Sequence, residues 1–182
     1  MKKVLFVVGS LREGSFNRQM AQVAEKMLEG KAEVSYLDYS QIPLFSQDLE
    51  KEGVPAVDAA RKEAQAADAI WIFSPIYNWN IPGTIKNTFD WLSRSLDPTN
   101  PSAESAIHDK FVTVSILGNS GQEQLVSLYQ GLLPAMRLQV IGEFTATRIN
   151  DSAWGTGKIE LTEEASKSLE HQVSDILKAI EA

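Results

Sequence analysis

A segment containing glycine and serine at positions 9–18, which reads GSLREGSFNR, has residues suited to binding an anion. Glycines let the backbone curve around a ligand, and a helix that starts after the segment presents unpaired N–H groups to negative charge. Ser10, Ser15 and Asn17 add neutral hydrogen-bonding groups. Arg12 can hold two phosphate oxygens with its planar guanidinium group. We therefore expect a site for a phosphate monoester here, with an ordinary turn and a solvated arginine as the alternative.

Two widespread nucleotide-binding motifs do not fit this segment. A Walker A motif needs a lysine before its Ser or Thr, whereas Ser15 directly follows Gly14. The segment also departs from G-x-G-x-x-G, which disfavours dinucleotide binding in the Rossmann manner. Without that fingerprint, we expect Asp38 to be a loop or capping residue rather than a ribose ligand.

The segment at positions 74–83, SPIYNWNIPG, places aromatic residues in a stiff loop. Its two prolines restrict the backbone, and Tyr77 and Trp79 stand where a mobile loop is normally polar. Such a loop suits a flat ring system. The alternative is that Tyr77, Trp79 and Trp91 pack a subunit interface, and both arrangements can hold together.

Positions 117–121, LGNSG, form a third candidate segment, in which two glycines permit close approach of the backbone to a ligand. A turn of this kind joins most strand–helix pairs, so alone it predicts little. Together, the three segments predict a site for a mononucleotide with a planar head. FMN, with a phosphate at one end and a fused ring system at the other, fits this combination best.

The three segments meet only if the elements before them belong to one sheet. Runs that are apolar on both faces predict central parallel strands at Val4–Val8, Ala69–Phe73 and Phe111–Leu117. More polar outer strands are expected at Glu33–Leu37 and Gln139–Thr145. Helical patterns occur at Phe16–Leu28, Ala56–Ala67, Thr84–Leu92, Glu123–Leu133 and from Thr162 onward. The alternation predicts a single domain over residues 1–182, an open doubly wound α/β sheet that binds ligands at the carboxyl ends of its strands.

The composition excludes several classes of function. The 17 Lys and Arg residues against 24 Asp and Glu give a net charge of −7, which argues against a nucleic-acid partner. The absence of cysteine removes thiolate nucleophiles, disulfides and Cys-ligated metal centres, and two histidines make a histidine-rich metal site improbable. A hydrolase would need His108 or His171 beside a serine, but no G-x-S-x-G elbow occurs. We expect no metal site.

No apolar run is long enough to cross a bilayer. The run at Val4–Val8 follows two lysines, as in a signal peptide, but it is too short, and the charged segment at positions 9–13 ends it. We therefore expect a cytoplasmic protein without a membrane partner.

Residues 9–18 and residues 74–94, which read SPIYNWNIPGTIKNTFDWLSR, resemble the NAD(P)H-dependent FMN reductases of the flavodoxin-like fold, a group that includes bacterial quinone, chromate and azo reductases. The likeness extends from Lys3 to Gly121. It implies a flavodoxin-like, five-stranded parallel sheet in the order 2-1-3-4-5, and a homodimer or homotetramer with active sites near subunit contacts. Ile42–Phe45, with Asp48 and Leu49, looks like the family's interface segment.

By position, the resemblance implies three groups of FMN-binding residues. The phosphate would be held by Ser10, Arg12, Ser15, Phe16 and Asn17. The ring would be lined by Pro75, Ile76, Tyr77, Asn78 and Trp79, and bordered at its other edge by Ser115, Gly118 and Gly121. Two positions differ from the family's usual pattern: Ile76 stands where many relatives have Glu, and Gln122 follows Gly121 where relatives commonly have a second glycine.

The resemblance implies an oxidoreductase that takes a hydride from NADPH or NADH onto FMN and passes it to a quinone-like or other small acceptor, or to free flavin. The flavin carries this chemistry, so no catalytic acid, base or nucleophile is expected from the protein. The alternative is a flavodoxin-type electron carrier without turnover of its own. Flavodoxins, however, usually have a Thr- and Gly-rich phosphate loop rather than one with an arginine.

Overall fold

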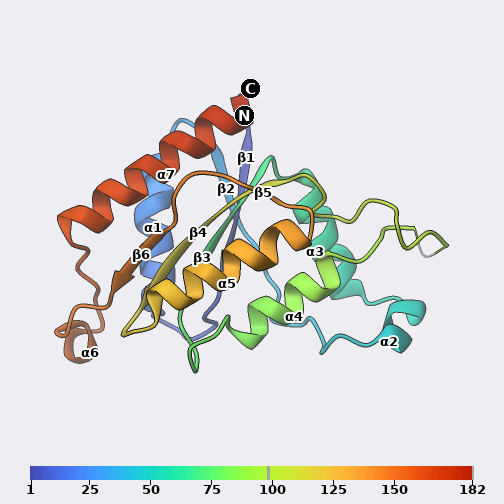
Figure 1. Ribbon diagram of the computed structural model, residues 1–182, viewed down its shortest axis with the longest axis horizontal. Helices are drawn as coiled ribbons and strands as arrows, with labels where there is room; N and C mark the ends of the chain where they lie inside the picture. Colours follow the sequence, from blue (N-terminus) through green and yellow to red (C-terminus); the bar gives the residue numbers. More distant parts are fainter. Residues whose placement is uncertain (98, 182) are drawn as a thin grey trace.

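A parallel sheet runs through the middle of the computed structural model, which describes residues 1–97 and 99–181 (Figure 1). Its strands are β1 Lys3–Val8, β2 Glu33–Tyr36, β3 Ala69–Ser74, β4 Phe111–Gly118, β5 Gln139–Val140 and β6 Thr145–Arg148. The strand order is β2-β1-β3-β4-β5, with every neighbouring pair parallel. The predicted doubly wound flavodoxin-like order is therefore confirmed.

The outermost position of the sheet differs from the single strand expected at Gln139–Thr145. Two short strands share it, because β5 pairs with the start of β4 and β6 pairs with its end. Between them the chain leaves the ladder at Gly142, whose φ of 63° is a left-handed conformation that favours glycine. β4 thus has a hydrogen-bonded partner strand on each side of this bend, which local hydrophobicity does not reveal.

Both faces of the sheet are covered, as the apolar runs predict (Figure 1). Along β1, Val4 and Phe6 pack toward the layer of α1 and α7, whereas Leu5 and Val7 pack toward the layer of α3, α4 and α5. The strand is fully buried at these four positions. The central strands thus form the core between two helical layers, and their carboxyl ends are left to carry the loops.

The helices are α1 Phe16–Leu28, α2 Gln47–Glu52, α3 Pro55–Ala66, α4 Gly83–Leu92, α5 Gln122–Ala135, α6 Ala153–Thr156 and α7 Glu163–Glu181. The five helices expected from the sequence are present, and Thr162 caps α7 by accepting a hydrogen bond from the Ala165 N–H at 3.1 Å. The two short helices α2 and α6 are not evident from hydrophobic periodicity, since each has at most one buried residue.

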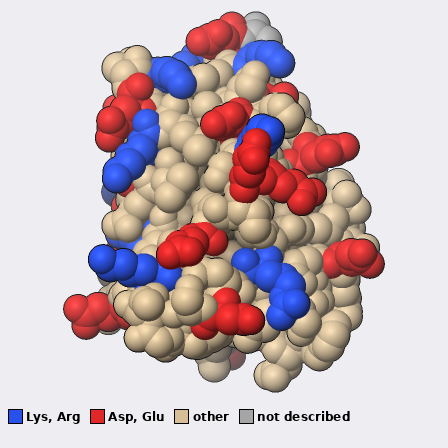
Figure 2. Space-filling view, turned by 90° about the vertical axis from the view of Figure 1, so that its left-hand side faces the viewer, with Lys and Arg blue, Asp and Glu red and all other residues tan. Residues whose placement is uncertain are grey.

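Charged side chains of both signs are interspersed on the face shown in Figure 2 rather than gathered into one patch of a single sign. Of the helices in the described residues, none combines the length and hydrophobicity needed to span a membrane.

Candidate functional site

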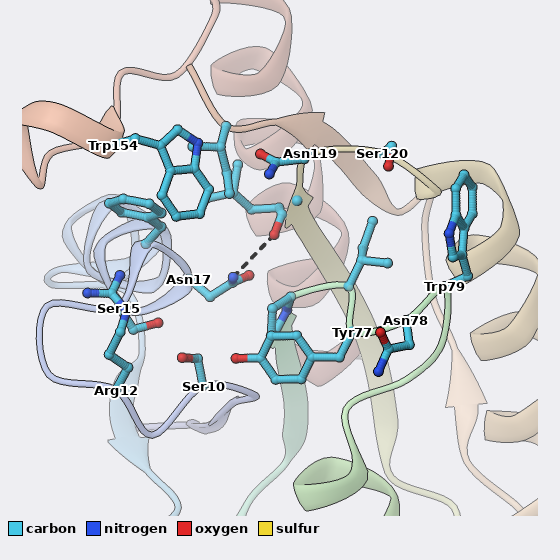
Figure 3. A pocket seen from close by; sticks show the side chains of 16 residues that line it. Ser10, Arg12, Ser15, Asn17, Tyr77, Asn78, Trp79, Asn119, Ser120 and Trp154 are labelled. Atoms are coloured by element: carbon cyan, nitrogen blue, oxygen red, sulfur yellow. Dashed lines mark hydrogen bonds between the residues drawn. The ribbon is translucent and has the colours of Figure 1, made fainter. Parts of the chain in front are cut away.

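A cavity of about 390 Å³ opens at the carboxyl edge of the sheet, where the loops after β1, β3 and β4 converge (Figure 3). Ligands of doubly wound sheets bind at this edge. All but two of the residues singled out from the sequence line it: Ser10, Arg12, Ser15, Phe16, Asn17, Pro75, Ile76, Tyr77, Asn78, Trp79 and Gly118. Segments far apart in the chain are thus brought to one hollow.

The first turn of α1 faces this cavity with unpaired backbone donors. Ser15 is the N-cap, and its Oγ accepts a hydrogen bond from the Arg18 N–H at 3.4 Å. The Ser15 carbonyl accepts the first intrahelical bond, from the Gln19 N–H at 3.0 Å. The N–H groups of Phe16 and Asn17 therefore have no acceptor within the helix. Together with the helix dipole, they make this end of the cavity suited to a phosphate or another anion.

Arg12 is held beside these donors by its own loop. Its Nη1 donates to the Glu13 carbonyl at 3.0 Å, its Nη2 donates to the Gly14 carbonyl at 3.1 Å, and its guanidinium carbon lies 5.0 Å from the centre of the Phe16 ring. A guanidinium group carries five N–H donors, so these two bonds leave donors for an anion. The loop thus orients the Arg12 side chain before a ligand binds and leaves some of its N–H donors for that ligand.

Asn17 has one satisfied and one unsatisfied polar atom. Its side chain is buried, and its Nδ2 donates to the Leu117 carbonyl oxygen at 3.2 Å, the bond drawn in Figure 3. Its Oδ1 is buried without a hydrogen-bond partner among the described residues. A buried oxygen without a partner costs free energy unless something donates to it. A ligand hydroxyl next to the phosphate position would supply that donor.

The loop after β3 is a tight turn with a strained tip. Tyr77 and Asn80 exchange backbone hydrogen bonds of 3.2 and 3.0 Å across it. The two residues between them, Asn78 and Trp79, have φ values of 51° and 61°, as in a type I′ turn. A glycine is usual at such positions, and a bulky residue there costs roughly 1 kcal/mol or more. The Tyr77 and Trp79 side chains are nevertheless 48% and 57% exposed, which presents aromatic surface at the cavity.

Gly118, the last residue of β4, and Gly121, which follows it, make room for this aromatic loop as well as for a ligand. A Cβ at Gly118 would lie 2.9 Å from the Ile76 side chain, and a Cβ at Gly121 would lie 2.9 Å from Cε3 of Trp79. Gly121 also has a φ of 89°. Gly118 lines the cavity, but Gly121 does not. The absence of side chains here therefore lets Ile76 and Trp79 pack against the third loop.

Ser115 does not reach the cavity either. It is fully buried, accepts a hydrogen bond from Trp71 Nε1 at 2.9 Å and donates to Gln172 Oε1 at 2.8 Å. Gln172 in turn donates to Thr113 Oγ1 at 2.7 Å and to the Val114 carbonyl at 2.9 Å. The side chain belongs to a polar network that joins α7 to the sheet beneath the site, so it supports β4 rather than bordering the hollow.

Five residues that the sequence reasoning did not single out also line the cavity: Leu117, Asn119, Ser120, Ile149 and Trp154. Asn119 and Ser120 lie inside the third loop, so their positions could have suggested them. Trp154 could have been suggested by its residue type, because it is a tryptophan in a polar segment. That segment follows the last strand and so lies at the same edge of the sheet. Its side chain is 63% exposed.

A buried tyrosine holds the end of β1 against the neighbouring elements. The Tyr39 hydroxyl donates to the Val8 carbonyl, and burial raises the pKa of this phenol to about 12. Asp38, next to it, accepts a hydrogen bond from the Ser40 N–H at 3.0 Å, which lowers the pKa of its carboxyl group. Asp38 is therefore a turn residue, as expected. His108 precedes β4 at the opposite edge of the sheet, away from the cavity.

Comparisons with known proteins identify the family of this chain. The profile of the family described as NADPH-dependent FMN reductase matches residues 2–151. A quinone reductase of Escherichia coli K12 is 36% identical over 121 residues, which cover 65% of this chain and 63% of that protein. An NAD(P)H:quinone oxidoreductase of Solanum tuberosum is 39% identical over 109 residues, 57% of this chain and 55% of that protein. The aligned part thus spans less than two thirds of these curated relatives.

The fold has solved counterparts as well. The structure of FerB, a flavoenzyme NAD(P)H:(acceptor) oxidoreductase from Paracoccus denitrificans, superposes with a TM-score of 0.79 at 24% identity and covers 100% of this chain and 98% of that one. That likeness concerns the fold. The profile match covers most of the chain, including the loops after β1, β3 and β4, and so this chain belongs to the NADPH-dependent FMN reductase family.

Proposed function

We propose that this protein is an FMN-dependent oxidoreductase that transfers a hydride from NADPH or NADH to a quinone-like or other small acceptor, or to free flavin. The observation that carries the proposal is the cavity itself, which has unpaired helix donors and Arg12 at one side and the aromatic turn at the other. This distribution matches a ligand with a phosphate and a planar ring. When bound, FMN supplies a ring that accepts a hydride and gives it up again.

The phosphate would be held by the N–H groups of Phe16 and Asn17, the Ser10 and Ser15 hydroxyls and the Arg12 guanidinium. The buried Asn17 Oδ1 would accept a hydrogen bond from a hydroxyl of the sugar-alcohol chain. Tyr77 and Trp79 would bound the ring, and the strained turn would keep both aromatic side chains in place. Each contact restrains the ligand, so the main contribution of the protein is orientation.

Among the described residues that line the cavity, none is a His, Asp, Glu or Lys. The side chains therefore offer no ordinary acid–base pair, in line with a reaction in which the cofactor carries the redox step. The protein would hold the donor and the acceptor against the ring one after the other. We accordingly propose ping-pong kinetics, and initial-rate patterns that require both substrates bound together would contradict this.

The deciding experiment is an absorption spectrum of the purified protein with FMN added, before and after anaerobic addition of NADPH. We expect FMN to be taken up and its visible absorption band to be bleached. Steady-state NADPH oxidation with a quinone then separates an enzyme from an electron carrier, because a carrier does not turn over unaided. A protein that takes up no FMN, or that binds it without turnover, would overturn the proposal.

We also propose a homodimer or homotetramer. In the segment Ile42–Phe45, the Pro43 carbonyl is fixed by Asn87 Nδ2 and Trp91 Nε1, each at 2.9 Å. The next residue, Leu44, projects with 82% of its surface exposed. A rigid segment with an exposed leucine suits a subunit contact. Sedimentation equilibrium of wild type and of Leu44→Asp tests this, and an all-monomer wild type would contradict it.

A further inference from the structure

One end of the cavity carries an aromatic side chain that a mononucleotide does not need. Figure 3 shows Trp154 on the same side of the cavity as Ser15 and Arg12, across from Trp79. Its ring centre lies 5.2 Å from that of Phe16 at an interplanar angle of 82°. Phe16 is only 7% exposed, whereas Trp154 is 63% exposed. The indole therefore covers Phe16 and still leaves much of its own surface free.

The backbone beneath Trp154 is fixed, so the exposed ring is not on a loose loop. Its neighbour Ala153 is fully buried. Asn150 closes the base of the segment, since its Nδ2 donates to Ser152 Oγ at 2.8 Å and its Oδ1 accepts from the Glu160 N–H at 2.9 Å. An ordered aromatic surface loses little entropy when a second ring stacks on it.

Gln19 connects this segment to the phosphate loop. Its Nε2 donates to the Gly157 carbonyl at 2.8 Å and to the Gly14 carbonyl at 3.2 Å, while its Oε1 accepts from the Ile159 N–H at 3.0 Å. One side chain thus sets the position of Trp154 relative to Arg12. Gln19 itself does not line the cavity.

The cavity therefore has aromatic surface at both ends, with phosphate-binding groups beside one of them. A ligand with two planar rings joined through phosphates matches this order, and a dinucleotide has that chemistry. The family profile ends at residue 151, so Trp154 lies outside the region that the profile describes.

We propose that Trp154 is the stacking platform for the adenine of a dinucleotide, with the adjoining phosphates near Arg12. The inference rests on the proposed function, whose nicotinamide donor is a dinucleotide with an adenylate half. FAD is a second dinucleotide with the same adenylate chemistry. Stacking of a base on an aromatic side chain is strong enough to change affinity roughly 5- to 100-fold. The indole of the exposed Trp154 also carries an N–H donor at its ring edge.

The first test uses ADP as the probe on flavin-free protein, followed by calorimetry and by tryptophan fluorescence. We expect Trp154→Ala to weaken ADP binding roughly 5- to 100-fold and Trp154→Phe to restore most of the affinity, because stacking needs only an aromatic face. Gln19→Ala removes no cavity contact, and we expect it to weaken ADP binding as well, through misplacement of the ring. Unchanged ADP affinity in Trp154→Ala would overturn the inference.

The second test identifies the source of the adenine. If it belongs to the donor, Trp154→Ala raises the KM for NADPH but not for reduced nicotinamide mononucleotide, which lacks the adenylate half. If it belongs to the flavin, the substitution weakens FAD binding but not FMN binding. Either result supports the stacking role of Trp154. The inference would be overturned if the substitution affected NADPH and reduced nicotinamide mononucleotide equally, and also affected FAD and FMN equally. A protein that binds ADP through Trp154 but takes up no flavin would refute the proposed function alone.

Discussion

The side-chain amide of Asn17 donates a hydrogen bond to the Leu117 carbonyl oxygen at 3.2 Å, which ties the first turn of α1 to the end of β4 across 100 positions of the chain. This bond joins the phosphate-binding end of the cavity to the third loop. The other polar atom of the same amide, Asn17 Oδ1, is buried and has no hydrogen-bond partner among the described residues. The residue thus has a structural atom and an atom available to a ligand.

Asn17→Asp should therefore affect both folding and binding. The new carboxylate places an acceptor against the Leu117 carbonyl and a negative charge beside the phosphate position. We expect the free energy of unfolding to fall by about 1–3 kcal/mol and FMN affinity to drop. Urea unfolding and FMN titration measure the two effects. Asn119→Asp is the control, because it adds the same charge to the cavity at an exposed residue; its stability should stay within about 0.5 kcal/mol of wild type.

Arg12→Ala should reduce FMN affinity far more than stability. The guanidinium is exposed and bonds only to carbonyls of its own loop, so its loss should change the free energy of unfolding by about 0.5 kcal/mol or less. Loss of a charged hydrogen bond to the phosphate should raise the Kd for FMN roughly 10- to 150-fold. Riboflavin has no phosphate, so its binding should be unchanged. Arg18→Ala is the control, since that side chain stacks on Tyr36 away from the cavity. Equal losses for FMN and riboflavin would refute the phosphate assignment.

Ser115→Ala distinguishes a supporting residue from a ligand-binding one. The substitution leaves Trp71 Nε1 without its acceptor and Gln172 Oε1 without one of its donors in a buried network. We expect stability to fall by about 1–3 kcal/mol while the Kd for FMN stays the same. Thermal unfolding and flavin titration provide the two measurements. A variant that keeps wild-type stability but binds FMN more weakly would contradict this and indicate that Ser115 contacts the ligand.

Gly121→Ala should displace Trp79. The added methyl would lie 2.9 Å from the indole, and the backbone has a φ of 89° that alanine adopts poorly. Strain and overpacking together should cost about 1–3 kcal/mol of stability and lower FMN affinity. Gly131→Ala is the matched control, because Gly131 lies within α5 and a Cβ there meets open space. We expect this substitution to raise the free energy of unfolding by about 0.5–1 kcal/mol. Tryptophan fluorescence should change only in Gly121→Ala.

Stability on the acid side should depend on Asp68. Burial acts to raise the pKa of this carboxyl group, but hydrogen bonds from the Lys3 N–H at 2.7 Å and Lys2 Nζ at 3.4 Å, with the positive charge of Lys2, outweigh it and lower the pKa. A pKa that is lower in the folded state adds stability above the unfolded pKa of about 3.9, and this contribution disappears as the pH falls through the folded value.

We therefore expect Asp68→Asn to be less stable than wild type by about 1 kcal/mol at pH 7, a modest value because the group is partly exposed. The difference should shrink as the pH falls below about 4 and disappear once the pH is below the folded-state pKa of Asp68. Urea unfolding at several pH values checks the trend, and a gap that stays constant with pH would contradict it.

Much of the architecture follows from local sequence. Runs such as Val4–Val8 are apolar at every position, and only a strand covered on both faces buries them all, so a parallel sheet between helices is indicated. Once the strands are parallel, the loops after β1, β3 and β4 must meet at one edge. That geometric necessity is why Arg12, Tyr77 and Gly118 could be assigned to one cavity from the sequence.

Other features depend on contacts between distant residues, which no local pattern encodes. The chain between Gln139 and Arg148 divides into two strands because β4 offers partners at both of its ends. Ser115 faces Trp71 and Gln172 instead of the cavity because of how α7 packs on the sheet.

By itself, then, the sequence determined the doubly wound sheet and the loops that meet at its carboxyl edge, since burial periodicity and parallel topology are properties of chain order. Only the tertiary structure decided which side chains fill the gaps between those loops. Trp79 packs against Gly121, and Trp154 packs against Phe16 in a segment that Gln19 binds through the Gly157 carbonyl. Such close packing depends on the positions of elements that are distant in the sequence.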